Sequence, residues 1–367
     1  MAYYKGPVPS QKLCRIVMFV AWAGCELPPF QSPGPCLTDI SLSENPPQPA
    51  TLSARVETAR RAGAGDARFR LTALLATLAV LAIFAGVITS LVIGAMPAFK
   101  AFGFGFIFTE AWSPTRERFG ALAPIYGTLV TSLIAMVIAV PVGIGIAIFL
   151  TDLCPRPLRR PIGIAIELLA GIPSIIYGIW GFFVFAPWFQ LHVQEPMATA
   201  LADVPILGTL FGGVTFGIGT FTAGLILSIM ILPFISAVTR DVLETVPSVL
   251  KEASYGLGAT SWEVMWKVCL PFCQTGVVGG AMLALGRALG ETMAVTFVIG
   301  NAHKIDASLF APGTSISASI ANEFTEATGE LYRSALIELG LLLFVITFVV
   351  LAAAQLMLRQ MERGKGK

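Results

Sequence analysis

The chain has 367 residues, of which 55% are hydrophobic and only 13% are charged, and its mean hydropathy is +0.78. This composition excludes a soluble globular protein, because too few polar residues are present to cover its surface, and it predicts an integral membrane protein. The formal net charge of +2 gives no bulk attraction to nucleic acid, so the positions of the charges are more informative than their sum.

Residues 1–70 precede the first long apolar run and are predicted to be a disordered or wrongly started N-terminal extension followed by a cytoplasmic basic segment. Leu13 to Gly24, with Cys25 after it, superficially resembles the apolar region of a signal peptide with a lipoprotein-like cysteine. Export there would place Arg55 to Arg70 outside the cell. Every later connection contradicts that orientation, so we favour the extension.

Apolar runs long enough to cross about 30 Å of hydrocarbon, which takes about 20 helical residues, appear six times. They are Leu71 to Met96, Ile125 to Leu150, Ile162 to Trp188, Thr222 to Val238, Gly276 to Gly300 and Ala335 to Leu358. Barrel strands would be shorter and alternate in polarity, so the predicted fold class is an all-α membrane protein, a polytopic bundle of about six transmembrane helices. Pro141, Pro173 and Pro233 fall inside these runs, where each missing backbone hydrogen bond needs compensation.

Lysine and arginine divide the connections into two groups. One group is rich in them: Arg55, Arg60, Arg61, Arg68, Arg70, Arg156, Arg159, Arg160, Arg240, Lys251, Lys267, Arg359, Arg363, Lys365 and Lys367. The other group has only Lys100, Arg116, Arg118, Lys304 and Arg333, and residues 190–221 contain none. The positive-inside rule places the first group and both termini in the cytoplasm. The predicted parts are therefore a first helix with its exterior loop (71–124), a membrane core (125–358) and a basic tail (359–367).

A mildly polar hairpin, residues 245–271, precedes the fifth apolar run. Pro247 suits a first helical turn, and Gly256 and Gly258 would end a short helix. Thr260 and Glu263 have the spacing of a capping box, which predicts a second short helix that stops just before the membrane.

This hairpin resembles the EAA motif of binding-protein-dependent ABC importer permeases, which reads E-A-A, three residues, G, nine residues, I-x-L-P. The matching residues are Glu252, Ala253, Ser254, Gly258, Val268, Leu270 and Pro271. Ser254 replaces an alanine of the motif, and Val268 replaces the isoleucine. The resemblance implies a coupling helix that docks on an ATPase subunit, with roles for Glu252, Ala253, Gly258, Leu270 and Pro271. An ordinary connecting hairpin, anchored at the headgroups by Trp262 and Trp266, is the alternative.

The chain contains no G-x-x-x-x-G-K-[ST] phosphate loop, so ATP and Mg would be used by a partner ATPase and no cofactor is predicted for this chain. His192 and His303 fall in predicted exterior loops, which excludes a bis-histidine haem inside the membrane and an H-E-x-x-H metalloprotease. We therefore predict no catalytic residue and no metal ligand, and a transport protein that is not an enzyme by itself.

Arg287 lies about eleven residues into the fifth apolar run, where a lone guanidinium costs at least ~2.5 to 3.5 kcal/mol. Glu291 follows four residues later, so a continuous helix would place both on one face and allow them to pair. The pair would either fix helix packing or serve an anion path, in which Arg287 binds an oxyanion and Glu291 keeps that binding weak.

Glu167, near the cytoplasmic end of the third run, is expected to snorkel to the interface.

The segment LGRALGETMAVTFVIGN, Leu285 to Asn301, resembles phosphate-specific transport (Pst) permeases, in particular the PstC type, and so does Glu167 to Phe185. The resemblance covers roughly residues 71–358 and not residues 1–50. It implies the MetI-like type I ABC importer permease fold in the bacterial cytoplasmic (inner) membrane, with Arg287, Glu291 and Thr292 in the substrate path.

The same resemblance implies three partners: a second homologous permease of the PstA type, an ATPase dimer and an extracytoplasmic phosphate-binding protein. We therefore expect a multi-pass subunit that imports inorganic phosphate by alternating access, with both termini in the cytoplasm. Sulfate or molybdate import by the same architecture is the first alternative. A membrane enzyme or an anion channel that works without ATP is a more distant one.

Overall fold

The computed structural model describes the backbone of residues 52–364 and the side chains of residues 68–361. The predicted extension at residues 1–50 lies outside the described residues, as does the end of the basic tail. The described part is helical, with no β-strand beyond two isolated bridges, which confirms the all-α prediction. The chain divides into Met1–Leu74 and Leu75–Lys367, within helix α2 (Leu52–Phe102), and the packing below is that of Leu75–Lys367.

Within the described residues, six helical segments are long and apolar enough to cross a membrane, as predicted. They are Arg68–Phe102, Leu122–Leu153, Ser174–Leu201, Thr220–Glu244, Ser261–Leu289 and Glu330–Met361. The first, second, fourth and sixth contain the predicted runs. The third and fifth begin or end at other residues than predicted, and this changes which functional residues share a helix.

The third predicted run, Ile162 to Trp188, is wrong at its start. Helix α5 (Arg156–Gly171) is a separate helix, and it ends because Ile172 and Pro173 have extended backbone angles. Proline disfavours the helical conformation of the residue before it, which explains the break. The membrane span begins at α6 (Ser174–Trp180) and continues through η4 (Gly181–Phe185), α7 (Ala186–Phe189), η5 (Gln190–Gln194) and α8 (Glu195–Leu201). Pro173 therefore caps a helix and does not interrupt one.

The fifth predicted run, Gly276 to Gly300, is wrong at both ends. Its helix begins in the hairpin at α12 (Ser261–Val264) and continues through a π-helical turn, η6 (Met265–Cys269), into α13 (Leu270–Leu289). The helix was predicted to stop at Pro271, but it continues through this residue. Leu270 N–H donates to Met265 O in the wider π-helical turn, and Pro271, which has no N–H to donate, comes directly after that turn. At the other end α13 stops at Leu289, and a short helix, α14 (Met293–Val298), follows.

Helix α10 (Thr220–Glu244) is the centre of the bundle, with 61% of its most apolar window buried, against 22% for α16 (Glu330–Gly364). It packs on α4 (Leu122–Ile148), which contains Pro141, and on α13. Glycines allow the close approach to α13: a Cβ on Gly276 would lie 2.6 Å from Val242 Cγ1, and one on Gly280 would lie 2.8 Å from Val238 Cγ1.

Ser334 of α16 is hydrogen-bonded to two backbone groups of α2. Ala98 N–H donates to Ser334 Oγ over 2.9 Å, and the Ser334 hydroxyl donates to Gly94 O over 2.8 Å. The serine thus completes the backbone hydrogen bonding of α2 beside Pro97, which supplies no N–H.

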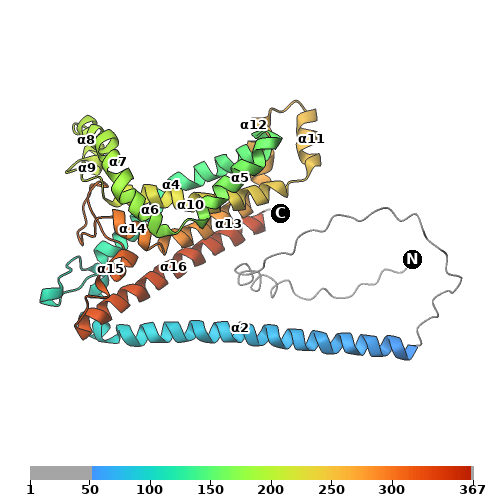
Figure 1. Cartoon of the computed structure of the whole chain (residues 1–367), viewed down its shortest axis with the longest axis horizontal. Helices are drawn as coiled ribbons and strands as arrows, with labels where there is room; N and C mark the ends of the chain where they lie inside the picture. The colour runs from blue at the N-terminus through green and yellow to red at the C-terminus, as the bar shows by residue number, and fades with distance from the viewer. Residues whose placement is uncertain (1–51, 365–367) are drawn as a thin grey trace. The chain divides into compact units, whose positions relative to one another are not determined.

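The connections of Leu75–Lys367 gather at two ends (Figure 1). The basic end comprises η3 (Phe149–Leu153), α5, the C-terminal turn of α10 and the hairpin with α11 (Ser248–Gly256) and α12. The loop end comprises residues 103–121, 190–219 and 301–329, including α3 (Gly105–Phe108), η2 (Pro114–Arg116), α9 (Leu207–Phe211) and α15 (Ile316–Glu323). Leu309 N–H donates to Leu210 O, and Ile305 N–H to Glu110 Oε1, so distant segments meet there. The described arginines assigned to the cytoplasm between residues 156 and 240 all lie at the basic end.

Candidate functional site

The first helix of the hairpin, α11, begins after Pro247 and ends at Gly256, as predicted. It is closed by a Schellman motif, in which Ala259 N–H donates to Ser254 O and Gly258 N–H donates to Tyr255 O. Gly258 has a φ of +85°, in the left-handed region, and a Cβ there would meet no atom within 4 Å. Glycine is therefore required at this turn by backbone conformation and not by crowding.

The predicted capping box begins the second helix. Glu263 N–H donates to Thr260 Oγ1, and Thr260 N–H donates to Glu263 Oε2. This helix does not end at the membrane boundary but is continuous with the fifth span. The hairpin is therefore directly connected to the helix that carries Arg287.

One face of the hairpin is seated on the bundle and the other is uncovered. The seated face contributes Val264, Met265 and Cys269 to an apolar cluster with α4 and α10. The uncovered face presents Glu252, Ala253, Gly258, Val249, Tyr255, Leu257, Trp262 and Trp266, and Leu257 is 90% exposed. Leu270 is half-buried and Pro271 exposed, at the start of α13. Large apolar side chains exposed at this end suit a protein partner better than water.

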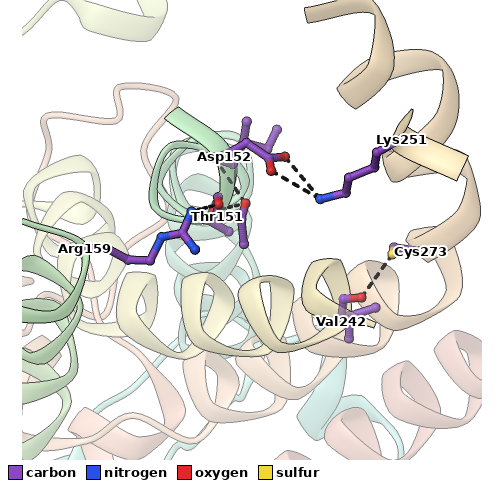
Figure 2. A network of polar contacts seen from close by, with 8 residues as sticks. Thr151, Asp152, Arg159, Val242, Lys251 and Cys273 are labelled. Atoms are coloured by element: carbon purple, nitrogen blue, oxygen red, sulfur yellow. Dashed lines mark hydrogen bonds and ion pairs between the residues drawn. The ribbon is translucent and has the colours of Figure 1, made fainter. Parts of the chain in front are cut away.

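An ion pair connects α11 to η3, the turn that follows α4 (Figure 2). Lys251 Nζ lies 3.2 Å from Asp152 Oδ1, and their side chains are only 21% and 25% exposed. Next to Asp152, the carbonyl of Thr151 accepts a hydrogen bond from the guanidinium of Arg159 on α5. Sequence reasoning missed this connection because its two members are 99 residues apart and neither has a local signal.

The structure overturns the predicted helical pairing of Arg287 and Glu291. Helix α13 ends at Leu289, so the two residues do not share a helical face, and the ion pairs of the described residues include none between them. Arg287 is exposed and its guanidinium carbon lies 4.5 Å from the ring centroid of Phe234 on α10. An aromatic face thus replaces the carboxylate as the partner of the charge.

The break between α13 and α14 is a non-helical segment, Gly290–Thr292, within the span predicted to cross the membrane. Glu291 N–H donates to Ala288 O over 3.4 Å, and the Thr292 hydroxyl to Gly290 O over 3.4 Å. Gly290 is exposed and Glu291 and Thr292 are half-buried. The break directly follows the end of the fifth observed span, Ser261–Leu289. Irregular backbone inside a membrane is tolerated only against protein or a water-filled cavity, so any part of the break within the hydrocarbon would need one of them. The three predicted path residues, Arg287, Glu291 and Thr292, lie at or beside this break.

A second charged pair was not predicted. Arg240 Nη2 on α10 lies 2.8 Å from Glu167 Oε1 on α5, which is therefore paired and not simply extended toward the interface. A Cβ on Gly163 would lie 3.2 Å from Arg240 Nη1, so the glycine allows α5 to approach α10. The sequence did contain a signal for this pair, because Glu167 and Arg240 have opposite charges and both lie near the predicted cytoplasmic boundary of the membrane.

The loop end contains a carboxylate with three side-chain partners. Glu323 Oε2 accepts from Trp112 Nε1 over 2.7 Å and from the Tyr332 hydroxyl over 2.6 Å, and Glu323 Oε1 lies 2.7 Å from His303 Nε2. Burial alone would raise the pKa of Glu323, but the hydrogen bonds from His303, Tyr332 and Trp112 outweigh it and lower that pKa. The imidazole of His303 stacks on Trp112. Among the residues described, no group of three His, Cys, Asp or Glu side chains is placed to hold a metal ion.

Comparison with known proteins gives the same architecture. Residues 139–363 match the family model of binding-protein-dependent transport system inner membrane components. A crystallised bacterial ABC transporter involved in the import of the polysaccharide alginate has a TM-score of 0.56 at 19% identity, covering 82% of this chain and 99% of that one. At that identity the likeness shows the fold alone, which is the ABC importer permease fold.

Two relatives are much closer in sequence, and both are named phosphate transport system permease protein PstC. The protein of Mesorhizobium japonicum is 60% identical over 318 residues, 87% of this chain and 97% of the relative. The protein of Pasteurella multocida is 58% identical over 299 residues, 82% of this chain and 93% of the relative. With six apolar helices among its described residues, the chain is a multi-pass membrane protein that belongs to the PstC-type family of ABC importer permeases.

Proposed function

We propose that this chain is the permease subunit that passes inorganic phosphate into the cytoplasm in an ATP-driven importer of the bacterial inner membrane. The observation that carries the proposal is the break at Gly290–Thr292, at the end of the fifth apolar span, which leaves exposed Arg287 beside non-helical backbone. Any part of that backbone within the hydrocarbon would need a second protein or water, and a path between two homologous permeases supplies both. The names of the relatives support phosphate as the cargo.

Arg287 would bind the phosphate oxyanion, because a guanidinium is always charged and offers a planar set of donors. The ring of Phe234 holds this cation without occupying its donor edge as a carboxylate would. Glu291 and Thr292 would line the path just beyond, where the like charge of Glu291 keeps phosphate from binding tightly. Weak binding lets the anion leave.

The uncovered face of the hairpin would dock on one subunit of an ATPase dimer, which hydrolyses ATP with Mg. In this proposal the permease has no catalytic step of its own. The second permease, of the PstA type, would present its own hairpin to the other ATPase subunit, and an extracytoplasmic phosphate-binding protein would deliver cargo to the loop end. Both termini and the basic end would then lie in the cytoplasm. Because α12 and α13 are continuous, displacement of the hairpin moves the helix that ends beside Arg287.

The test is uptake by the full importer reconstituted in vesicles. Arg287→Gln should abolish ATP-dependent phosphate accumulation while the complex still assembles, and Arg287→Lys, which keeps the charge but loses the planar fork, should retain a small part of it. Normal phosphate accumulation by the Arg287→Gln importer would refute the role of Arg287. Competition by sulfate or molybdate that matches phosphate would reassign the cargo, and uptake without ATP would point to a channel.

A further inference from the structure

A second anion site is suggested by a cavity at the basic end, between α5 and α10, away from Arg287. Its volume is about 300 Å³. Its charged lining consists of four arginines and two glutamates: Arg156, Arg159, Arg160, Arg240, Glu167 and Glu244. We call it the arginine pocket.

The positive charge of this pocket is only partly compensated. Arg240 is paired with Glu167, and its Nη2 lies 3.6 Å from Asp241 Oδ1, so carboxylates of the protein compensate its charge. Arg159 donates to a neutral carbonyl, that of Thr151, and keeps its full charge. In the part of the chain that is described, the side chains of Arg156 and Arg160 have neither an ion pair nor a hydrogen-bond partner. Four guanidinium groups therefore face two lining carboxylates, and two of the four, those of Arg156 and Arg160, use none of their donors.

The position of these arginines along α5 adds to the excess of positive charge in the pocket. Arg156, Arg159 and Arg160 lie in the first turns of this 16-residue helix, whose first turn contains no acidic residue. The N-terminal end of a helix carries partial positive charge, so cations there are unfavourable unless an anion joins them. An anion bound at this end of α5 would offset that unfavourable interaction.

We propose that the arginine pocket binds a phosphate group. Arginine matches a phosphate group geometrically, because its planar donors pair with two oxygens at once, and the unused donors of Arg156 and Arg160 are open to such a ligand. The group would belong either to free inorganic phosphate at the basic end or to the headgroup of an anionic lipid. Basic pockets between helices at the cytoplasmic leaflet suit lipid headgroups too. Only the free-phosphate source rests on the proposed transport function.

Occupancy of the pocket would reach the hairpin through a short series of contacts (Figure 2). A phosphate group would compete with Thr151 O for the Arg159 guanidinium. Thr151 adjoins Asp152, which holds Lys251 of α11. The ligand would thus bind at one end of the connection that fixes the hairpin to the bundle.

The test measures unfolding temperature of the permease–ATPase complex, purified without the binding protein and carrying Arg287→Gln throughout, so that phosphate does not act through the proposed path residue. Inorganic phosphate is titrated at constant ionic strength in neutral detergent. In parallel, nanodiscs of phosphatidylcholine with and without phosphatidylglycerol are compared. The pocket variant is Arg156→Gln/Arg160→Gln. The matched control is Arg116→Gln/Arg118→Gln, which removes two exposed arginines at the loop end.

We expect stabilisation by at least one probe in the pocket-intact complex and in the matched control, and binding about tenfold weaker or worse in the pocket variant. A pocket-dependent effect of inorganic phosphate alone identifies a free anion, and one of phosphatidylglycerol alone identifies a lipid headgroup. If neither probe distinguishes the pocket variant from the matched control, the proposal is wrong. Uptake by otherwise unaltered Arg287 and Arg287→Gln importers is scored separately, so failure of the transport proposal is distinguishable from failure of this one.

Discussion

The two ends of the bundle differ in how far their side chains find partners within the chain. At the loop end, Glu323 is only 17% exposed and has three side-chain partners, and aromatic rings stack around it. At the basic end, the hairpin leaves Leu257, Trp262 and Trp266 exposed, although its other face packs on the bundle and Lys251 pairs with Asp152 of η3.

This difference separates a scaffold from a docking surface. A partly buried carboxylate that accepts from three side chains of different segments holds those segments in one arrangement, because removing the carboxylate leaves the three donors without their acceptor. An uncovered apolar face, on a hairpin whose other face is packed on the bundle, leaves its apolar contacts for a partner. The predictions below would break or sharpen this contrast.

The largest effect is expected at the loop end. Glu323→Ala removes the acceptor shared by Trp112, Tyr332 and His303, and should lower the free energy of unfolding by about 2 to 3 kcal/mol. Glu323→Gln keeps the shape and one acceptor oxygen, so it should cost less than half as much. Denaturation of the purified protein in detergent measures both, and a neutral result for Glu323→Ala would remove the scaffold interpretation.

The next effect is expected at the turn of the hairpin. Gly258→Ala forces an L-residue into the left-handed region, at a cost of about 1 to 2 kcal/mol, although no atom crowds the new Cβ. We expect loss of ATPase from the purified complex, or ATP hydrolysis without transport. Gly256→Ala is the matched control, because Gly256 lies in α11 with open space around it and should behave as wild type. Equal retention and coupling in both variants would argue against a coupling role.

A smaller effect is expected from the tether between Lys251 and Asp152. The pair is partly buried, and its coupling energy should be about 1 kcal/mol in a double-mutant cycle of Lys251→Met and Asp152→Asn. The more informative measurement is phosphate-stimulated ATPase activity of the complex, which should fall in each single variant and fall no further in the double variant. Additive losses would mean that the two residues act independently.

The smallest effect is expected from mild acidification. The pKa of Glu323 is lowered in the folded protein, so its ionised form contributes stability that is complete above the ordinary carboxyl pKa and is lost only as pH falls through the lowered value. Between pH 7 and about pH 5, this carboxylate should leave the unfolding temperature unchanged. Below the ordinary carboxyl range, wild type should lose stability more steeply than Glu323→Gln. Parallel pH curves would show that another group controls acid unfolding.

The sequence was sufficient where the signal is local. Hydropathy identified six spans, the spacing of Thr260 and Glu263 identified a capping box, and Gly258 marked the turn, because each depends on residues within a few positions. The EAA motif and the segment Leu285 to Asn301 likewise pointed to the family that the relatives confirm.

Tertiary structure decided the rest. Pro173 began a span, whereas the helix continued through Pro271, since only the surrounding turn determines whether a proline ends a helix. The break at Gly290 separated Arg287 from Glu291 and left the arginine against Phe234, a residue 53 positions away whose position depends on how α10 and α13 pack. The pairs of Arg240 with Glu167 and Lys251 with Asp152 depend on the same packing. Composition and local pattern thus determined the membrane class, the six spans and the hairpin, but long-range contacts decided the partners of the charges, because a charge pairs with whichever group the packed helices place beside it.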